Sequence, residues 1–358
     1  MKRAMSLVLV ALLVICTTGF AGCAKTGNTT PTGSKLRVVL YVNATLGDKS
    51  FFDSANAGIQ QAISELGITG KTVEGGTDTS KWEPDITQLA SSGDWDIIIV
   101  DIADLADVIA KLAPQYPNMK FIGFDGTADY TKGNLTNVYS IEYKQNEASF
   151  LAGVLAALVT ESSMPLANKA KVVGFLGGMD IPVINDFKVG FLQGVKAVDP
   201  AVKVLVSYVG SWSDAARCKE LALAQIAQGA DVVWGVAGQS GLGAIDAAKE
   251  KQCYALGVDS DQAEIIKATD PQEANLVLTS VLKNVGTSLY RAIKMAQDGT
   301  DASFYGKAES LGLAEGTVGL ADNDIYQKVV PAVIRAKVED YSKKIASGAI
   351  KVDTALGS

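Results

Sequence analysis

The stretch GDWDIIIVDIADL at residues 93–105 decides the fold. Its centre is an uninterrupted apolar run, which is typical of a parallel strand that helices cover on both faces. The run ends at Asp101 and leads directly into a helical pattern, as in a βα unit. A second version, GADVVWGVAGQSG, stands at residues 229–241. The sequence therefore predicts one parallel α/β unit that occurs twice.

Two further pairs of segments extend this internal repeat. KFIGFDG at 120–126 aligns with YALGVDSD at 254–261, and GDKSFFDSANAG at 47–58 corresponds to GMDIPVINDFKVG at 178–190. Two copies of a doubly wound unit predict two lobes with a cleft between them. Ligands of such folds bind at the carboxyl ends of the strands, where these loops would face one another.

The expected strands are short β-rich runs separated by helical stretches. They lie at 36–43, 72–74, 96–101 and 120–125 in the first half, and at 171–176, 202–208, 231–237 and 254–259 in the second. A helix is expected over 54–66, where Ile59, Ile63 and Leu66 recur at helical spacing.

Later segments suggest how the two lobes are connected. We expect the chain to cross between lobes three times, near 138–143, 279–283 and 310–319. These crossings form a hinge suited to closure on a ligand. The resulting boundaries are 36–140 with 284–309 for the N-terminal lobe, and 141–283 with 310–358 for the C-terminal lobe.

Residues 1–23 have the pattern of a bacterial export signal. Lys2 and Arg3 precede an apolar run, and small residues follow it. Phe20-Ala21-Gly22-Cys23 resembles the lipobox, in which the cysteine becomes acylated and N-terminal after cleavage. We therefore expect a lipid anchor at Cys23 on the extracytoplasmic face of a cell membrane, with a signal-anchor helix as the alternative. Residues 24–35 are small and polar and predict a flexible tether.

Composition excludes several classes of function. The 358 residues carry a net charge of −7 and include no histidine. Nucleophilic catalysis that uses a histidine base and zinc sites that use histidine ligands are therefore excluded. An acidic chain without a basic cluster is also a poor partner for nucleic acid. Cys218 and Cys253 are expected to be separate buried thiols.

Searches for catalytic and cofactor motifs also give negative results. The sequence has no nucleophile elbow, no complete Walker A motif and no cysteine pair or ligand cluster with metal-site spacing. We expect no catalysis, no cofactor and no metal site.

Six segments together resemble the basic membrane protein family of bacterial lipoproteins, which is related to purine nucleoside receptors. They are 47–58, 174–200, 208–222, 237–251, 257–262 and 278–285. The resemblance covers residues 36–350 and implies a type I periplasmic-binding-protein fold. It also implies a monomeric substrate-binding component of an ABC importer that delivers a small molecule, usually a nucleoside or purine, to a membrane permease.

A purine nucleoside would need aromatic walls, acceptors for the base and groups that bind the ribose hydroxyls. The candidates are Phe51 or Phe52 and Phe187 or Phe191 for the walls, Asp125 for the base, Asp48, Asp259 and Lys283 for the ribose, and the backbone amides of Gly238 and Ser240. Each has a structural alternative: the phenylalanines as core residues, Asp48 as a helix cap, and Asp259 with Lys283 as an ion pair across the hinge.

Two other positions have structural interpretations, and one loop departs from the family pattern. Asp104 is expected to cap a helix and Trp212 to act as a hydrophobic staple, while Asp101 is left open. Phe52 and Asp53 replace an amide and a polar residue of the family loop. The added ring makes riboflavin or a free purine base the alternative ligand. A nucleoside-cleaving enzyme and a sensor for a receptor are the alternatives from other classes.

Overall fold

The computed structural model describes residues 35–357, so residues 1–34 and Ser358 lie outside the description. The predicted signal peptide at 1–23, the lipid site at Cys23 and all but the last residue of the tether fall in that undescribed part. Within the described part, no helix combines the length and the apolar character needed to cross a membrane.

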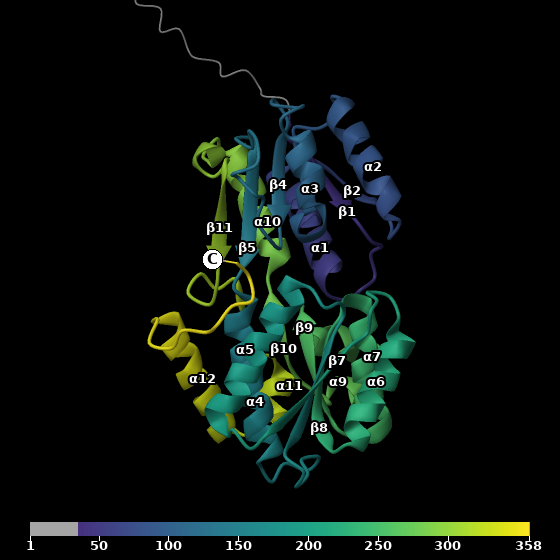
Figure 1. The fold of residues 1–358 in the computed structure, drawn as a ribbon, viewed down its shortest axis with the longest axis vertical. Helices are drawn as coiled ribbons and strands as arrows, with labels where there is room; N and C mark the ends of the chain where they lie inside the picture. Colours follow the sequence, from purple (N-terminus) through teal and green to yellow (C-terminus); the bar gives the residue numbers. More distant parts are fainter. Residues whose placement is uncertain (1–34, 358) are drawn as a thin grey trace, which may run out of the picture. The chain divides into compact units, whose positions relative to one another are not determined.

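The first lobe is built on a six-stranded sheet with the order β11-β5-β4-β3-β1-β2 (Figure 1). All neighbouring strands in it are parallel. The strands are β1 (Arg37–Val42), β2 (Thr69–Glu74), β3 (Ile97–Asp101), β4 (Lys120–Phe124), β5 (Val138–Tyr143) and β11 (Lys307–Leu311). The helices are α1 (Phe51–Leu66), α2 (Thr79–Ser91), α3 (Ile102–Leu112) and α10 (Val285–Gln297), with a 3₁₀ turn at Asp301–Ser303.

The second lobe repeats the arrangement with the strand order β12-β10-β9-β8-β6-β7. Its strands are β6 (Val172–Gly177), β7 (Lys203–Tyr208), β8 (Ala230–Val236), β9 (Tyr254–Asp259), β10 (Val277–Lys283) and β12 (Val318–Leu320). Its helices are α4 (Gln145–Thr160), α5 (Pro182–Val198), α6 (Ala215–Ala227), α7 (Leu242–Lys251), α8 (Gln262–Lys267), α9 (Pro271–Ala274), α11 (Asp324–Val329) and α12 (Ala332–Ala346), with a 3₁₀ turn at Gly238–Gly241. Only β12 runs antiparallel to its neighbour. The duplicated parallel α/β fold predicted from the sequence is confirmed.

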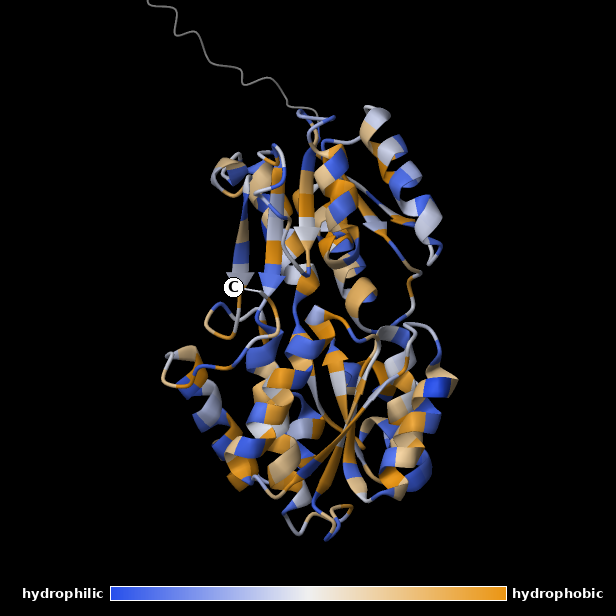
Figure 2. Ribbon diagram, viewed as in Figure 1, coloured by the Kyte–Doolittle hydropathy of each residue, from blue (hydrophilic) through white to orange (hydrophobic). Residues whose placement is uncertain are grey.

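Apolar residues on both faces of the strands explain why helices cover both sides of each sheet. In β1, Val38 and Leu40 belong to the same buried cluster as Ile59 of α1. Val39 and Tyr41, which alternate with them, belong to the cluster that includes residues of α2 and α3. The central strands are accordingly apolar, while hydrophilic and hydrophobic residues alternate along the helices (Figure 2).

The chain passes between the two sheets at three places. After β5 it enters α4, which packs on α5 of the second lobe, and after β10 it enters α10, which packs on α1 of the first. The third passage joins β11 to β12. The segment 138–143, expected as a crossing, is a full strand of the first sheet, and the chain leaves that sheet directly after it.

Both cysteines of the second lobe are buried free thiols, as expected from the sequence. Cys218 lies in α6, and Cys253 directly precedes β9. Burial raises the pKa of each thiol to about 12, so neither is ionised at neutral pH.

Helices α4 and α5 touch through their backbones. A β-carbon on Gly194 would lie 2.0 Å from the carbonyl oxygen of Phe150, and one on Gly153 would lie 2.2 Å from that of Phe191. Real side chains do not approach this closely, so the glycines set the distance between the two helices.

Substituting Gly194→Ala is expected to lower the free energy of unfolding by about 1–3 kcal/mol, because the helices must separate to admit the methyl group. Urea denaturation of the purified domain that starts at residue 35 measures this loss of free energy of unfolding. Lys196→Ala, on an exposed position of the same helix, is the control and should change stability by less than about 0.5 kcal/mol. An increase in stability of Gly194→Ala, as helix propensity alone predicts, would contradict the packing argument.

Candidate functional site

A cavity opens between the two lobes at the carboxyl ends of the strands. The space between its walls is about 930 Å³, part of which is open solvent. Residues that end or follow strands in both sheets line it, among them Asn43, Asp101 and Asp125 from the first and Asp259 and Lys283 from the second. The cavity lies where the doubly wound rule places ligands.

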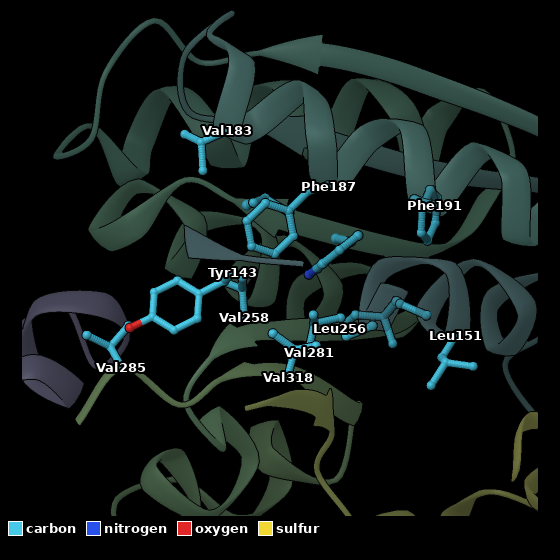
Figure 3. Close-up of a cluster of buried hydrophobic side chains, with 14 of the residues drawn as sticks. Tyr143, Leu151, Val183, Phe187, Phe191, Leu256, Val258, Val281, Val285 and Val318 are labelled. Carbon is cyan, nitrogen blue, oxygen red and sulfur yellow. The ribbon is translucent and has the colours of Figure 1, made fainter. Parts of the chain in front are cut away.

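Eight of the ten candidate binding residues line this cavity. They are Asp48, Phe51, Phe52, Asp125, Phe187, Gly238, Asp259 and Lys283. Ser240 does not line it: this residue is buried, and its backbone N–H donates to the carbonyl oxygen of Trp212 at 3.0 Å. Phe191 does not: it is fully buried and packs on Phe175 and Trp234 in the core of the second lobe. Phe187 and Phe191 lie one turn apart on α5 (Figure 3). Only Phe187 is among the residues that line the cavity. The binding role assigned to Phe191 is therefore corrected to a core role.

Three buried charged side chains that line the cavity form a row, with Lys283 between Asp125 and Asp259. The Nζ of Lys283 donates to Asp125 Oδ1 at 2.6 Å and lies 4.0 Å from Asp259 Oδ1. Their side chains are 3% exposed for Lys283 and 8% for each aspartate. Burial opposes the charge on Lys283, but Asp125 and Asp259 outweigh it and raise the pKa of the lysine. Lys283 is therefore protonated in the folded protein.

Asp259 keeps one carboxylate oxygen available. Its Oδ2 accepts a 2.6 Å hydrogen bond from Ser50 Oγ, which belongs to the first lobe, whereas its buried Oδ1 has no hydrogen-bond partner in the described part. Burial raises the pKa of Asp259, and Lys283 opposes that shift. An unused buried acceptor in a cavity is costly unless something donates to it. Asp259 Oδ1 is thus a ready acceptor for a ligand hydroxyl.

The two strand-end aspartates share an unusual backbone conformation. Asp125 has φ of 67° and Asp259 has φ of 63°, both in the left-handed region. Aspartate and asparagine tolerate this region better than most side chains. Both carboxylates are therefore held at the cavity by a local backbone feature that a β-branched residue would disfavour.

Aromatic rings surround the Lys283 ammonium group. Its Nζ lies 4.7 Å from the ring centroid of Phe51, 5.1 Å from that of Phe187 and 5.8 Å from that of Tyr143. Phe187 and Tyr143 approach this region from different elements (Figure 3). These contacts favour a charged, immobile lysine. The ion pair foreseen between Lys283 and Asp259 is present, but the shorter contact of Lys283 is to Asp125.

Asp48 organises the start of α1. Its carboxylate accepts from the backbone N–H groups of Ser50, Phe52 and Asp53, which confirms the capping alternative. Burial raises the pKa of Asp48 to about 6, against those three hydrogen bonds. Asp53, the unusual residue of this loop, accepts from the N–H groups of Gly47 and Lys49 at 2.8 Å each and so braces the loop.

Trp212 forms part of the cavity wall, whereas the sequence predicts a hydrophobic staple beside a helix cap. It lines the cavity, half-buried, in the loop between β7 and α6. Its ring lies over Gly178, where a β-carbon would come within 2.4 Å of Trp212 Cζ3. The staple role predicted for Trp212 does not account for this position. Gly178, which directly follows β6, leaves room for the Trp212 ring. A glycine at this position is the one sign in the sequence that a ring packs there.

The end of β3 also differs from expectation. Asp101, not Asp104, caps α3, because Asp101 Oδ1 accepts from the N–H of Ala103 at 3.0 Å. Asp104 instead accepts from the side-chain amide of Asn43 at 2.8 Å. All three residues line the cavity, and Asn43 was missed because an asparagine after a strand is common in turns.

Comparison with known proteins places this site in a family. The model of the Bmp family, described as PnrA-like ABC transporter substrate-binding proteins, matches residues 35–351. The chain belongs to this PnrA-like family. The PnrA-like match covers both lobes and every residue that lines the cavity.

Individual relatives cover most of the PnrA-like chain. The CD4+ T-cell-stimulating antigen of Listeria monocytogenes is 32% identical over 89% of this chain and 88% of its own length. The ABC transporter nucleoside-binding protein BmpA of Lactococcus lactis is 30% identical over 96% and 98%. The solved structure of an ABC transporter solute-binding protein from Aeropyrum pernix has a TM-score of 0.79 and 27% identity, covering 89% of this chain and 93% of that one.

These similarities settle the class of function. The chain is a substrate-binding protein of an ABC transporter. The Lactococcus lactis relative and the Aeropyrum pernix structure are likewise named as binding proteins of ABC transporters. The two-lobed fold seen in the structure is that of periplasmic binding proteins, as predicted.

Proposed function

We propose that this substrate-binding protein captures a purine nucleoside in the cleft between its lobes and presents it, as a monomer, to a membrane permease. Asp125 would meet the base edge, and Asp259 with Lys283 would meet the ribose hydroxyls. The backbone of Gly238 would approach the ligand closely because glycine has no side chain. No covalent chemistry is involved.

One observation carries the proposal: aromatic walls from opposite lobes flank a buried row of charges. Phe51 and Phe52 come from α1, and Phe187 and Trp212 come from the second lobe. The ring centroids of Phe51 and Phe187 lie 4.7 Å and 5.1 Å from the Nζ of Lys283, the central member of the Asp125–Lys283–Asp259 row. Asp259 Oδ1 has no hydrogen-bond donor among the described residues. Stacking surfaces beside hydroxyl-binding groups suit a flat base joined to a sugar.

The similarity to the Lactococcus lactis protein, which is named a nucleoside-binding protein, supports the same ligand class. The second candidate is a flavin, which the additional ring of Phe52 in the cavity lining favours. A free purine base would leave Asp259 Oδ1 without the ribose donor.

Native mass spectrometry of the domain from residue 35 tests the proposal. We expect a co-purified mass that matches a nucleoside, removable by partial unfolding and restored, with a thermal shift, by adding adenosine, guanosine or inosine. A flavin mass would replace the purine assignment by the second candidate. Absence of any response to nucleosides would overturn the proposal.

Substituting Trp212→Ala is expected to weaken nucleoside binding about 5- to 150-fold, because one stacked base face is worth about 1–3 kcal/mol. Trp212 is half-buried, so stability should change little. Isothermal titration calorimetry gives the Kd. Phe191→Leu is the matched aromatic control: it should lower the unfolding free energy and leave the Kd as it is. The reverse pattern would contradict the wall assignment.

We further propose that acyl chains on Cys23 hold the protein on the extracytoplasmic face of the cell membrane. The Phe20-Ala21-Gly22-Cys23 segment supports this, and a relative in Pyrococcus abyssi, 31% identical over 90% of this chain, is named a lipoprotein. The intact mass of protein extracted from its native membrane tests it. An N-terminus at Cys23 with added acyl mass is expected, and an unmodified N-terminus there would refute it.

A further inference from the structure

The first-lobe end of the cavity contains a cluster of acceptors that the proposed nucleoside contacts leave unused. The cluster consists of Asn43, Asp101 and Asp104, all lining the cavity. It combines the end of β1, the end of β3 and the first turn of α3. Lys283 is committed to Asp125, and neither Asp101 nor Asp104 has an ion-pair partner in the described part of the chain.

Asn43 supplies the observation that points to a ligand. The side chain is 5% exposed, and its Nδ2 donates to Asp104 Oδ2, which fixes the amide orientation. Its buried Oδ1 has no hydrogen-bond partner in the described residues. A buried carbonyl oxygen without a partner at a cavity wall can accept a hydrogen bond from what fills the cavity, whether a water or a ligand.

The two aspartates add further acceptors to the same place. The described hydrogen bonds of their carboxylates are one from Ala103 N–H to Asp101 and one from Asn43 to Asp104, so each keeps acceptor capacity. Burial, then Asp104 and Asp125, raise the pKa of Asp101. An amino group, which carries more than one hydrogen, could donate both to Asn43 Oδ1 and to one of the two carboxylates, and a positively polarised donor would also reduce the like-charge repulsion between them.

We propose that the Asn43–Asp101–Asp104 cluster is a specificity subsite for an amino group on the ligand. Amino-substituted purine nucleosides then bind more tightly than counterparts that lack the amino group. The proposal rests on the proposed function, since it selects among purine nucleosides. It also predicts rejection of ligands that bring negative charge to this end, such as xanthosine.

The test measures Kd by calorimetry for two matched pairs: guanosine with inosine, which differ by the 2-amino group, and adenosine with purine riboside, which differ by the 6-amino group. We expect one pair to show an amino preference of about ten- to a hundredfold, as for hydrogen bonds to charged groups. Asp101→Asn with Asp104→Asn should bring that pair close to parity, because asparagine keeps the cap of α3 but loses the charge.

Asp107→Asn removes the same charge from an exposed position of α3 that does not line the cavity, and it should leave both affinities unchanged. Nucleoside binding without an amino preference in either pair, or a preference that survives the double substitution, overturns the subsite while the proposed function stands. Absence of binding by all four nucleosides overturns the proposed function and the subsite together.

Discussion

Asp259→Asn is expected to weaken nucleoside binding roughly a hundredfold or more, the range found when one member of a buried charged contact is removed. The reason lies in Asp259 Oδ1, the buried acceptor without a hydrogen-bond partner in the described residues. An asparagine has a single oxygen acceptor and a nitrogen donor in place of the two carboxylate oxygens. If its nitrogen faces the ligand, the acceptor for the ligand hydroxyl is lost; if its nitrogen faces Ser50, the hydrogen bond from Ser50 Oγ is lost. Asparagine tolerates the φ of 63°, so the substitution changes the chemistry and not the backbone.

Calorimetry on protein stripped of ligand, with thermal unfolding alongside, separates this from a purely structural role. We expect the unfolding temperature of ligand-free Asp259→Asn to stay close to that of the parent, because a lost attraction to Lys283 is offset by the lost burial cost of the charge. Asp94→Asn, at an exposed position, controls for net charge. A large fall in ligand-free stability with only a small change in Kd would show that Asp259 is a structural ion-pair partner.

Lys283→Met is expected to lower the free energy of unfolding by about 3–5 kcal/mol, because it leaves buried carboxylates without their cation. Methionine fits the aromatic surroundings formed by Phe51, Phe187 and Tyr143, so lost packing contributes little. Urea denaturation measures the loss. Adding Asp125→Asn to Lys283→Met removes one of the unpaired charges and should recover part of the stability.

The stability deficit of Lys283→Met should also depend on pH in a defined direction. Burial already raises the pKa of Asp259 while Lys283 is present. A carboxyl whose pKa is higher in the folded state stabilises the fold when protonated, and that stability is lost as pH rises through the folded-state pKa. The deficit relative to the parent should therefore be smaller near about pH 5 than near about pH 8. A deficit independent of pH, with no recovery from Asp125→Asn, would show that lost packing is the cause.

The central strands of the fold could be predicted from sequence because their signals are local. β3 and β8 are apolar on both faces and lead into helices, and the resemblance between the halves supplied the duplication. Two of the edge strands, β11 and β12, could not be recognised in the same way. β11 reads KAESL and β12 reads VGL, which are short or mostly polar, since an edge strand has less surface to bury. β5 carries Ser140 and Glu142 among its apolar residues and was interpreted as a crossing.

The candidate site was predictable where a residue ends a strand. Such positions are occupied by Asp125, Asp259 and Lys283. In a doubly wound fold the carboxyl ends of the strands face the cleft, so the fold type alone predicts that these side chains lie there. Choosing between Phe187 and Phe191 required the placement of α5 against Trp234, which no local pattern encodes. Trp212 lies in a loop whose path depends on contact with Gly178.

The order of strands in the first sheet has a consequence for synthesis of the chain. β5 is complete at Tyr143, but its outer neighbour β11 is encoded at Lys307–Leu311, and α10, which packs on α1, precedes β11 by only a few residues. A nascent chain synthesised only as far as β5 therefore has β5 as an unpaired edge strand, and the face of α1 that α10 later covers is still exposed. The second sheet likewise awaits β12. Neither lobe can complete its sheet until translation is nearly finished, and pairing between such distant segments is slow.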